Sequence, residues 1–199
     1  MPNSIHLGMK NYVAIAFVIL ILACNNESDK NKTEDTGGDV SFFPTASFFA
    51  GQVKLVDSLQ LPVLKFVTSN GRTDTTQIST REMGIMATDF LQTDLSGPEL
   101  RKSYKEESFA DQSISSVTLT YSTKNKDLPI QRMDVLINPN PVMNDKVRSI
   151  YIEKLEKHGD TSVLKKMYWK TDKHFLVISS AKVDNDPPVI TQLRVQWDQ

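Results

Sequence analysis

The chain has 199 residues, of which 23 are Lys or Arg and 24 are Asp or Glu, so its formal net charge is −1. This balance gives no reason to expect nucleic acid as a partner, because such partners select for an excess of basic residues. A single cysteine excludes an intramolecular disulfide framework. The length is sufficient for one domain with a sizeable hydrophobic core.

The N-terminal segment has the layout of an export signal. Lys10 is the only charged side chain before an apolar run over 12–23, and a polar tract follows Cys24. A basic start, a short apolar region and a small residue before the cleavage point define a secretory signal peptide. A membrane-spanning helix needs about 20 apolar residues, so this run is too short to be one.

The end of this segment resembles the lipobox of bacterial lipoproteins. Ile21 and Ala23 occupy its usual aliphatic and small positions, Cys24 follows, and Leu22 is a less common occupant. The resemblance implies signal cleavage between Ala23 and Cys24, with palmitate-type acylation of the Cys24 sulfur and later of its amino group. Two or more acyl chains hold a protein stably on a bilayer, so the expected partner of Cys24 is the membrane.

The segment over 24–41 predicts a lipidated cysteine followed by a flexible polar tether. Residues 25–40 hold too little apolar side-chain surface to offset their chain entropy. Asn25 is not the aspartate that retains some lipoproteins in the inner membrane. The resemblance therefore favours the outer membrane of a Gram-negative cell envelope, and leaves both the periplasmic and the outward side open.

Helical spacing and turn signals follow from residue 42 onward. Pro44 with the apolar residues Phe49, Val53 and Val56 predicts a helix over 44–58. Strands are expected over 63–69 and 72–78, because Asn70-Gly71 is a strong hairpin signal.

Two further helices are expected before the sheet. Ser79 and Glu82 form a capping box. It precedes one helix whose buried face holds Met83, Met86, Ala87, Phe90 and Leu91. A short helix over 98–105 should bury Leu100 and Tyr104 on its inner side.

Beyond residue 113 the apolar period changes to two, which is typical of strands with one buried face. Six runs show it: 117–121, 133–137, 146–155, 163–170, 175–181 and 189–197. The whole of 42–199 is therefore predicted to be one α+β domain. Its N-terminal helices should pack on a curved antiparallel β-meander of about six strands. The alternative is a more closed, barrel-like domain that includes the 63–78 hairpin.

The search for catalytic and metal-binding motifs gives little. The sequence has no Gly-x-Ser-x-Gly elbow, no His-Glu-x-x-His motif and no phosphate-binding glycine loop. We therefore predict no catalytic residue, no metal site and no cofactor. Three weaker candidates remain. A zinc site would use the turn histidines His158 and His174 with Asp160 or Asp172, and a calcium loop would use Asp184, Asn185 and Asp186. Glu106, Glu107 and Asp111 lie on an expected loop, where carboxylates are usually just solvated.

Two other groups of side chains have both a structural and a functional interpretation. The lysines 165, 166, 170 and 173 could bind an anionic glycan, a lipid headgroup or an acidic partner, or could protect a solvated sheet face or edge. The second group fits a core, or the lining of an apolar groove. It consists of Phe42, Phe43, Phe48, Phe49, Met83, Met86 and Phe90.

These patterns predict a lipid-anchored protein of the cell envelope without catalytic activity. We expect a binding or assembly module with an envelope protein partner. The alternative is a carrier or sensor for an apolar ligand held in a groove between helices and sheet. A hydrolase acting on envelope glycans or peptides is the third hypothesis.

Overall fold

The computed structural model describes residues 42–139, 146–184 and 186–197. The predicted signal peptide, Cys24 and the predicted tether lie outside the described residues. The described part holds four helices and nine strands, in the chain order α1 (Thr45–Ser58), β1 (Val63–Ser69), β2 (Arg72–Ile78), α2 (Thr80–Met86), α3 (Thr88–Leu91), α4 (Pro98–Arg101), β3 (Lys105–Asp111), β4 (Ser116–Ser122), β5 (Ile130–Asn138), β6 (Lys146–His158), β7 (Thr161–Lys170), β8 (His174–Val183) and β9 (Val189–Gln196).

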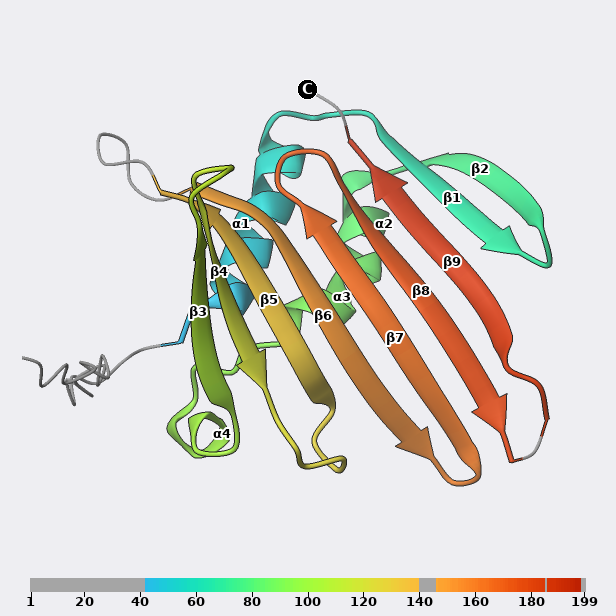
Figure 1. Ribbon diagram of the computed structural model, residues 1–199. Helices are drawn as coiled ribbons and strands as arrows, with labels where there is room; N and C mark the ends of the chain where they lie inside the picture. The colour runs from blue at the N-terminus through green and yellow to red at the C-terminus, as the bar shows by residue number, and fades with distance from the viewer. Residues whose placement is uncertain (1–41, 140–145, 185, 198–199) are drawn as a thin grey trace, which may run out of the picture. The chain divides into compact units, whose positions relative to one another are not determined.

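All nine strands form one antiparallel sheet in the order β2-β1-β9-β8-β7-β6-β5-β4-β3 (Figure 1). Strands β3 to β9 form the predicted meander, with one more strand than expected. The hairpin β1–β2 joins this sheet beside β9, at the edge opposite β3. Because β2 and β3 lie at opposite edges, the described sheet is open, and the barrel-like alternative is wrong.

The short helices α1, α2 and α3 lie on one side of the sheet, and no helix of the described residues covers its other side (Figure 1). Helix α1 begins after Pro44, and Phe49 and Val56 on its inner side are fully buried. It ends at Ser58, Leu59 is its C-cap, and Gln60 has a φ of 49° in the turn that leads to β1. The prediction of a helix over 44–58 is confirmed to within one residue.

The predicted β1–β2 hairpin is also confirmed. Asn70 and Gly71 have φ values of 50° and 74°, as the turn between two directly paired strands requires.

The second predicted helix is interrupted. Helices α2 and α3 are separate, with Ala87 between them. Next to the break, the Thr88 hydroxyl donates to the Ile85 carbonyl over 2.7 Å, a side-chain bond that competes with the helical ladder. The capping box of Ser79 and Glu82 is present as predicted.

Two further predictions are corrected near the β3 edge. Helix α4 ends at Arg101, and Leu100 is 38% exposed, although Tyr104 is buried as expected. Glu106, Glu107 and Asp111 lie in strand β3 and not in a loop. The sequence of β3 does not indicate a strand, because β3 lies at the edge of the sheet and few of its side chains are buried, so no apolar alternation is required.

Candidate functional site

The space between the helices and the centre of the sheet is filled by aromatic side chains. Five rings make successive contacts with centroids 5.0–5.3 Å apart. They belong to Phe49, Phe90, Trp169, Phe175 and Trp197, all at most 1% exposed. The prediction that the phenylalanines and methionines of the helices form a core is therefore confirmed for Phe42, Phe49, Met83 and Phe90, and Phe43, Phe48 and Met86 pack against it half-buried.

A network of four charged side chains also lies between α3 and the sheet. Asp89 of α3 accepts hydrogen bonds from Lys154 of β6 (2.9 Å) and Lys165 of β7 (2.7 Å). Glu156 of β6 lies 2.7 Å from the Lys154 ammonium and 2.9 Å from that of Lys165. Lys154 and Lys165 are directly opposite each other in the strand register.

Each charge in this network has two partners of opposite sign. Burial alone would raise the pKa of both carboxyls, but hydrogen bonds from the two ammonium groups outweigh it and hold each pKa below its ordinary value. Burial would likewise lower the pKa of each lysine, yet the carboxylates raise it. With every charge paired, the arrangement holds α3 against the sheet and has no group poised for proton transfer.

The uncovered side of the sheet, here called the open face, has a different composition. The strand register aligns one row of side chains across five neighbouring strands. This row consists of Tyr151, Tyr168, Leu176, Arg194 and Phe66. The Arg194 guanidinium lies 5.9 Å from the centre of the Phe66 ring, within the range of a cation–π contact.

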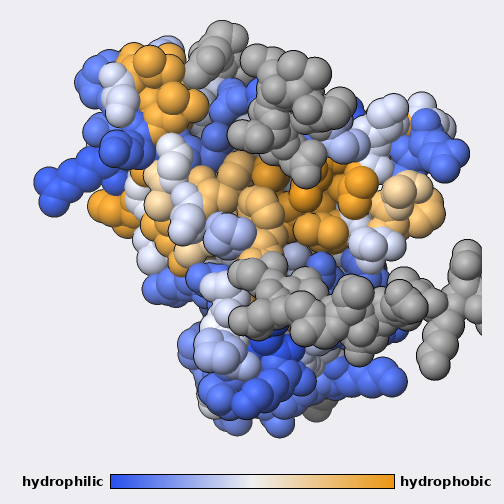
Figure 2. Space-filling view, turned by 90° about the vertical axis from the view of Figure 1, so that its left-hand side faces the viewer, coloured by the Kyte–Doolittle hydropathy of each residue, from blue (hydrophilic) through white to orange (hydrophobic). Residues whose placement is uncertain are grey.

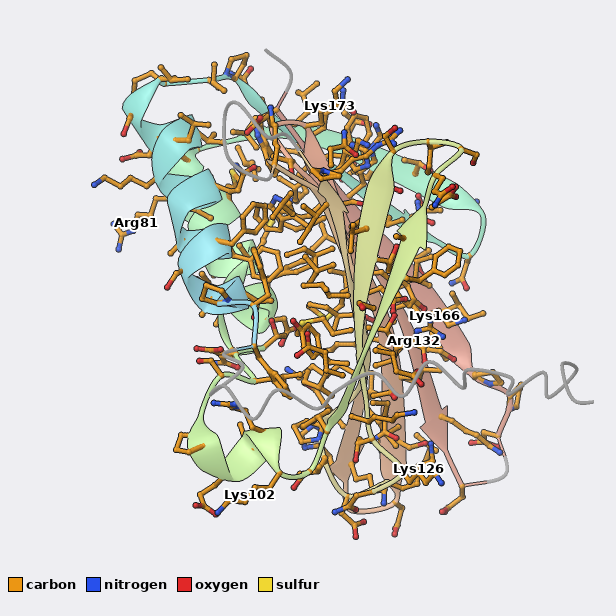
Figure 3. All side chains as sticks on the ribbon, turned by 60° about the vertical axis from the view of Figure 1, so that its left-hand side comes forward. Arg81, Lys102, Lys126, Arg132, Lys166 and Lys173 are labelled. Carbon is orange, nitrogen blue, oxygen red and sulfur yellow. The ribbon has the colours of Figure 1, made fainter. Side chains whose placement is uncertain are left out.

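Cations on the open face contrast with those on the helix side. Lys166 and Lys170 of β7, Lys182 of β8 and Arg194 of β9 form no ion pair with the described residues, whereas Lys165, on the helix side of β7, has two partners. Figure 3 shows Lys166 on the side of the sheet away from the helices. The buried Lys154 and Lys165 are thus paired, whereas these four cations of the open face have no ion-pair partner among the described residues.

The predicted lysine cluster is therefore divided between surfaces. Lys165 points to the helices, Lys166 and Lys170 lie on the open face, and Lys173 lies in the turn before β8. Strand β7 has four strands on each side of it, so Lys166 and Lys170 do not protect a sheet edge. Their position agrees with the other structural interpretation, a solvated sheet face.

The candidate zinc residues do not meet. His158 lies at the end of β6 and His174 at the start of β8, which are opposite ends of the sheet (Figure 1). Asp172 accepts a hydrogen bond from the side chain of Gln52 in α1 over 3.0 Å, and its backbone N–H donates to the same side chain. This pair fastens the β7–β8 turn to α1.

The acidic candidates are also separated. Asp184 and Asp186 lie in the turn after β8, and Asn185 lies outside the described residues. On β3, Glu106 faces the helix side and Glu107 the open face. The Oε2 atom of Glu106 is buried and has no hydrogen-bond partner among the described residues. Burial raises the pKa of this carboxyl, while Arg101 nearby opposes the shift.

A band of hydrophobic surface lies between the helices and the sheet on the side of β3 (Figure 2). Val117, Leu119 and Ile137 are half-buried on the helix-facing side of β4 and β5.

Among the described residues, no group of three or more His, Cys, Asp or Glu side chains is arranged to hold a metal ion. No helix in the described ranges is both long and apolar enough to cross a bilayer. No family model, curated protein or solved structure matches the chain.

The sequence singled out Lys166 and Lys170 of the open face, but not Tyr168, Arg194 or Phe66. The alternate positions of each period-two run were expected to be solvated. Taken together, the alternate positions of 161–170, 174–183 and 189–196 carry no Asp or Glu. The neighbours across strands could not be read from the sequence.

Proposed function

We propose that this chain is a lipid-anchored protein of a Gram-negative cell envelope, and that it binds an envelope component through the open face without catalysing a reaction. Acylation of Cys24 would hold it at the outer membrane, and the segment over 25–41 would serve as tether. The observation that supports binding is the one-sided cover: three helices lie on one face of a nine-stranded sheet, while the other face presents Lys166, Lys170, Lys182 and Arg194, which form no ion pair with the described residues, beside aromatic rings.

The anchor is tested by changing its sulfur. Cys24→Ala should abolish incorporation of labelled palmitate in the native host and leave the protein unprocessed or released from membranes. A variant that is still labelled, or that still sediments with membranes at the same mass, contradicts the lipoprotein assignment.

Binding through the open face is tested by site-specific photocrosslinking in intact cells. A photoreactive residue at Leu164, on the open face of β7, should give one defined adduct with an envelope component. The matched control is Ile85 on α2, which is 66% exposed and lies on the helix side. Equal adducts from both positions, or none from Leu164, would argue against the open face as the binding surface.

A second function, carriage or sensing of a hydrophobic ligand, is favoured by the apolar band between the helices and strands β3 to β5 (Figure 2). Native mass spectrometry of gently purified protein should then show a bound lipid. Its loss in Leu119→Gln would support this band as the site. Protein that is ligand-free in every preparation would remove this alternative.

A further inference from the structure

The open face is divided into two halves of different charge. The half formed by β7, β8, β9, β1 and β2 is called the cationic half. Its side chains on the open face include no Asp or Glu, because the one acidic residue of these strands, Asp74, pairs with Val67 on the helix side. Its cations are Lys166, Lys170, Lys182 and Arg194.

The other half, formed by β3 to β6, carries carboxylates on the same face. Asp134 accepts hydrogen bonds from Thr120 and Arg132, and Glu153 accepts one from Tyr151 over 2.7 Å. Glu107 of β3 lies further along the same face. A flat anionic bilayer laid on this sheet would contact both halves and be repelled by these carboxylates. A narrow, extended anion can follow the cationic half alone.

The side chains between the cations favour a particular chemistry. The register places Ile178, Gln192, Thr68 and Thr73 in one row with Lys166, and Glu153 of β6 lies at the other side of Lys166 without forming an ion pair with it among the described residues. The adjacent row carries Tyr168 and the Arg194–Phe66 pair. Amides, hydroxyls and half-buried aromatic rings between well-separated cations suit a polyhydroxylated ligand, since rings accept the C–H faces of sugars and hydroxyls exchange hydrogen bonds with Gln and Thr.

Cation spacing also indicates a polymer. Lys166 and Lys170 are four residues apart on β7, roughly 13 Å along the strand. Arg194 lies two strands away, about 10 Å across the sheet. A single small anion cannot reach all three cations, whereas a chain with repeated carboxylates can.

We propose that the cationic half binds an acidic, carboxylate-bearing polysaccharide, with Lys166, Lys170 and Arg194 on its carboxylates and Tyr168 against a sugar ring. This inference rests on the proposed function, because it names the ligand class of the open face.

The test uses the lipidated mature protein in nanodiscs of zwitterionic lipid, with polygalacturonate as probe and neutral dextran as control polymer. We expect polygalacturonate to bind, and to bind more weakly at high ionic strength because salt screens exposed charges. The double variant Lys166→Gln/Arg194→Gln should weaken binding about tenfold or more, and Tyr168→Ala about threefold to tenfold. Dextran should not bind.

The matched control is Lys102→Gln/Lys105→Gln, which removes two exposed cations outside the cationic half. It should change binding by less than about twofold. Unchanged melting temperatures establish that all variants are folded. Equal losses in the control, or no binding of polygalacturonate, overturn the inference.

Two further probes separate the other partner classes. Binding of poly-glutamate with the same affinity and the same dependence on Lys166 and Arg194 would indicate an acidic peptide instead. Preferential binding to anionic vesicles would indicate a lipid surface. If polygalacturonate fails while Leu164 still gives its crosslink in cells, the proposed function stands and the polysaccharide does not; if both fail, both are wrong.

Discussion

At the scale of single residues, stability is concentrated in the aromatic cluster. Phe90 is fully buried, and its ring contacts those of Phe49, Trp169 and Phe175 at 5.2, 5.0 and 5.3 Å. Rings in such a cluster contribute through burial and through their edge-to-face geometry.

Replacing Phe90 by alanine should therefore open a cavity where helix and sheet meet. We expect Phe90→Ala to lower the free energy of unfolding by about 3–5 kcal/mol. Urea titration followed by tryptophan fluorescence measures it. Exposed Ile85→Ala is the control and should cost less than about 1 kcal/mol. A similar cost for both variants would show that the cluster is not the centre of the core.

The buried Glu106 carboxyl predicts that the free energy of unfolding decreases as pH rises, whereas most carboxylates make it decrease as pH falls. Its folded-state pKa is raised by burial, so its contribution to stability is fully present below the unfolded pKa and is lost as pH rises through the folded pKa. Glu106→Gln should remove this loss, so that stability falls less than in the wild type as pH rises above about 4.

Glu107 provides the matched comparison on the same strand. A hydrogen bond from Lys105 lowers the pKa of its exposed carboxyl, so any contribution is lost as pH falls. Between pH 4 and 7, the dependence of the unfolding free energy on pH should therefore differ from the wild type in Glu106→Gln and not in Glu107→Gln. Urea denaturation at several pH values measures it. Identical curves for Glu106→Gln and the wild type would contradict the assignment.

At the scale of elements, the charged network explains how a helix as short as α3 is held. Four residues cannot form a stable helix alone. Phe90 inserts into the core, and Asp89 binds β6 and β7 through two lysines whose side chains are only 10% and 18% exposed.

Asp89→Asn should destabilise the fold by about 1–3 kcal/mol, because it leaves two half-buried ammonium groups with one carboxylate. The lowered carboxyl pKa means that the wild-type contribution is present above the unfolded pKa and lost as pH falls below about 4. The raised lysine pKa values mean a second loss above about pH 10.5.

Thermal melting at pH 7 and at pH 3 measures this difference. The difference in melting temperature between the wild type and Asp89→Asn should be large at pH 7 and smaller at pH 3. Glu99→Gln, which breaks an exposed pair with Lys102, should cost less than about 0.5 kcal/mol. A gap that is independent of pH would exclude the network as its cause.

At the scale of the whole molecule, the core that the described residues form runs from Phe42 to Trp197. We therefore expect a chain of residues 41–199 to melt within about 3 °C of the mature protein, a shift of roughly 1 kcal/mol at this size. Differential scanning calorimetry compares the two. A decrease of about 10 °C would show that the N-terminal segment contributes to the domain.

Local signals in the sequence predicted most of the elements because their causes are local. Asn70-Gly71 fixed one hairpin, the capping box fixed the start of α2, and period-two alternation located six strands. Strand β3 was missed because its seven residues are mostly polar, and the break at Ala87 was missed because the apolar spacing continues across it.

Sequence alone determined helix α1, the β1–β2 hairpin, the six strands β4 to β9 and the core aromatics of the helices, and it supplied the expectation of a lipid anchor at Cys24. Only the tertiary structure decided that β1 lies beside β9, that the sheet stays open, and that Lys165 and Lys166 lie on opposite faces with different partners. The reason is that burial patterns and turns act over a few residues, whereas strand order and charge pairing join residues far apart in the chain. The surface that we propose for binding exists only through those distant pairings.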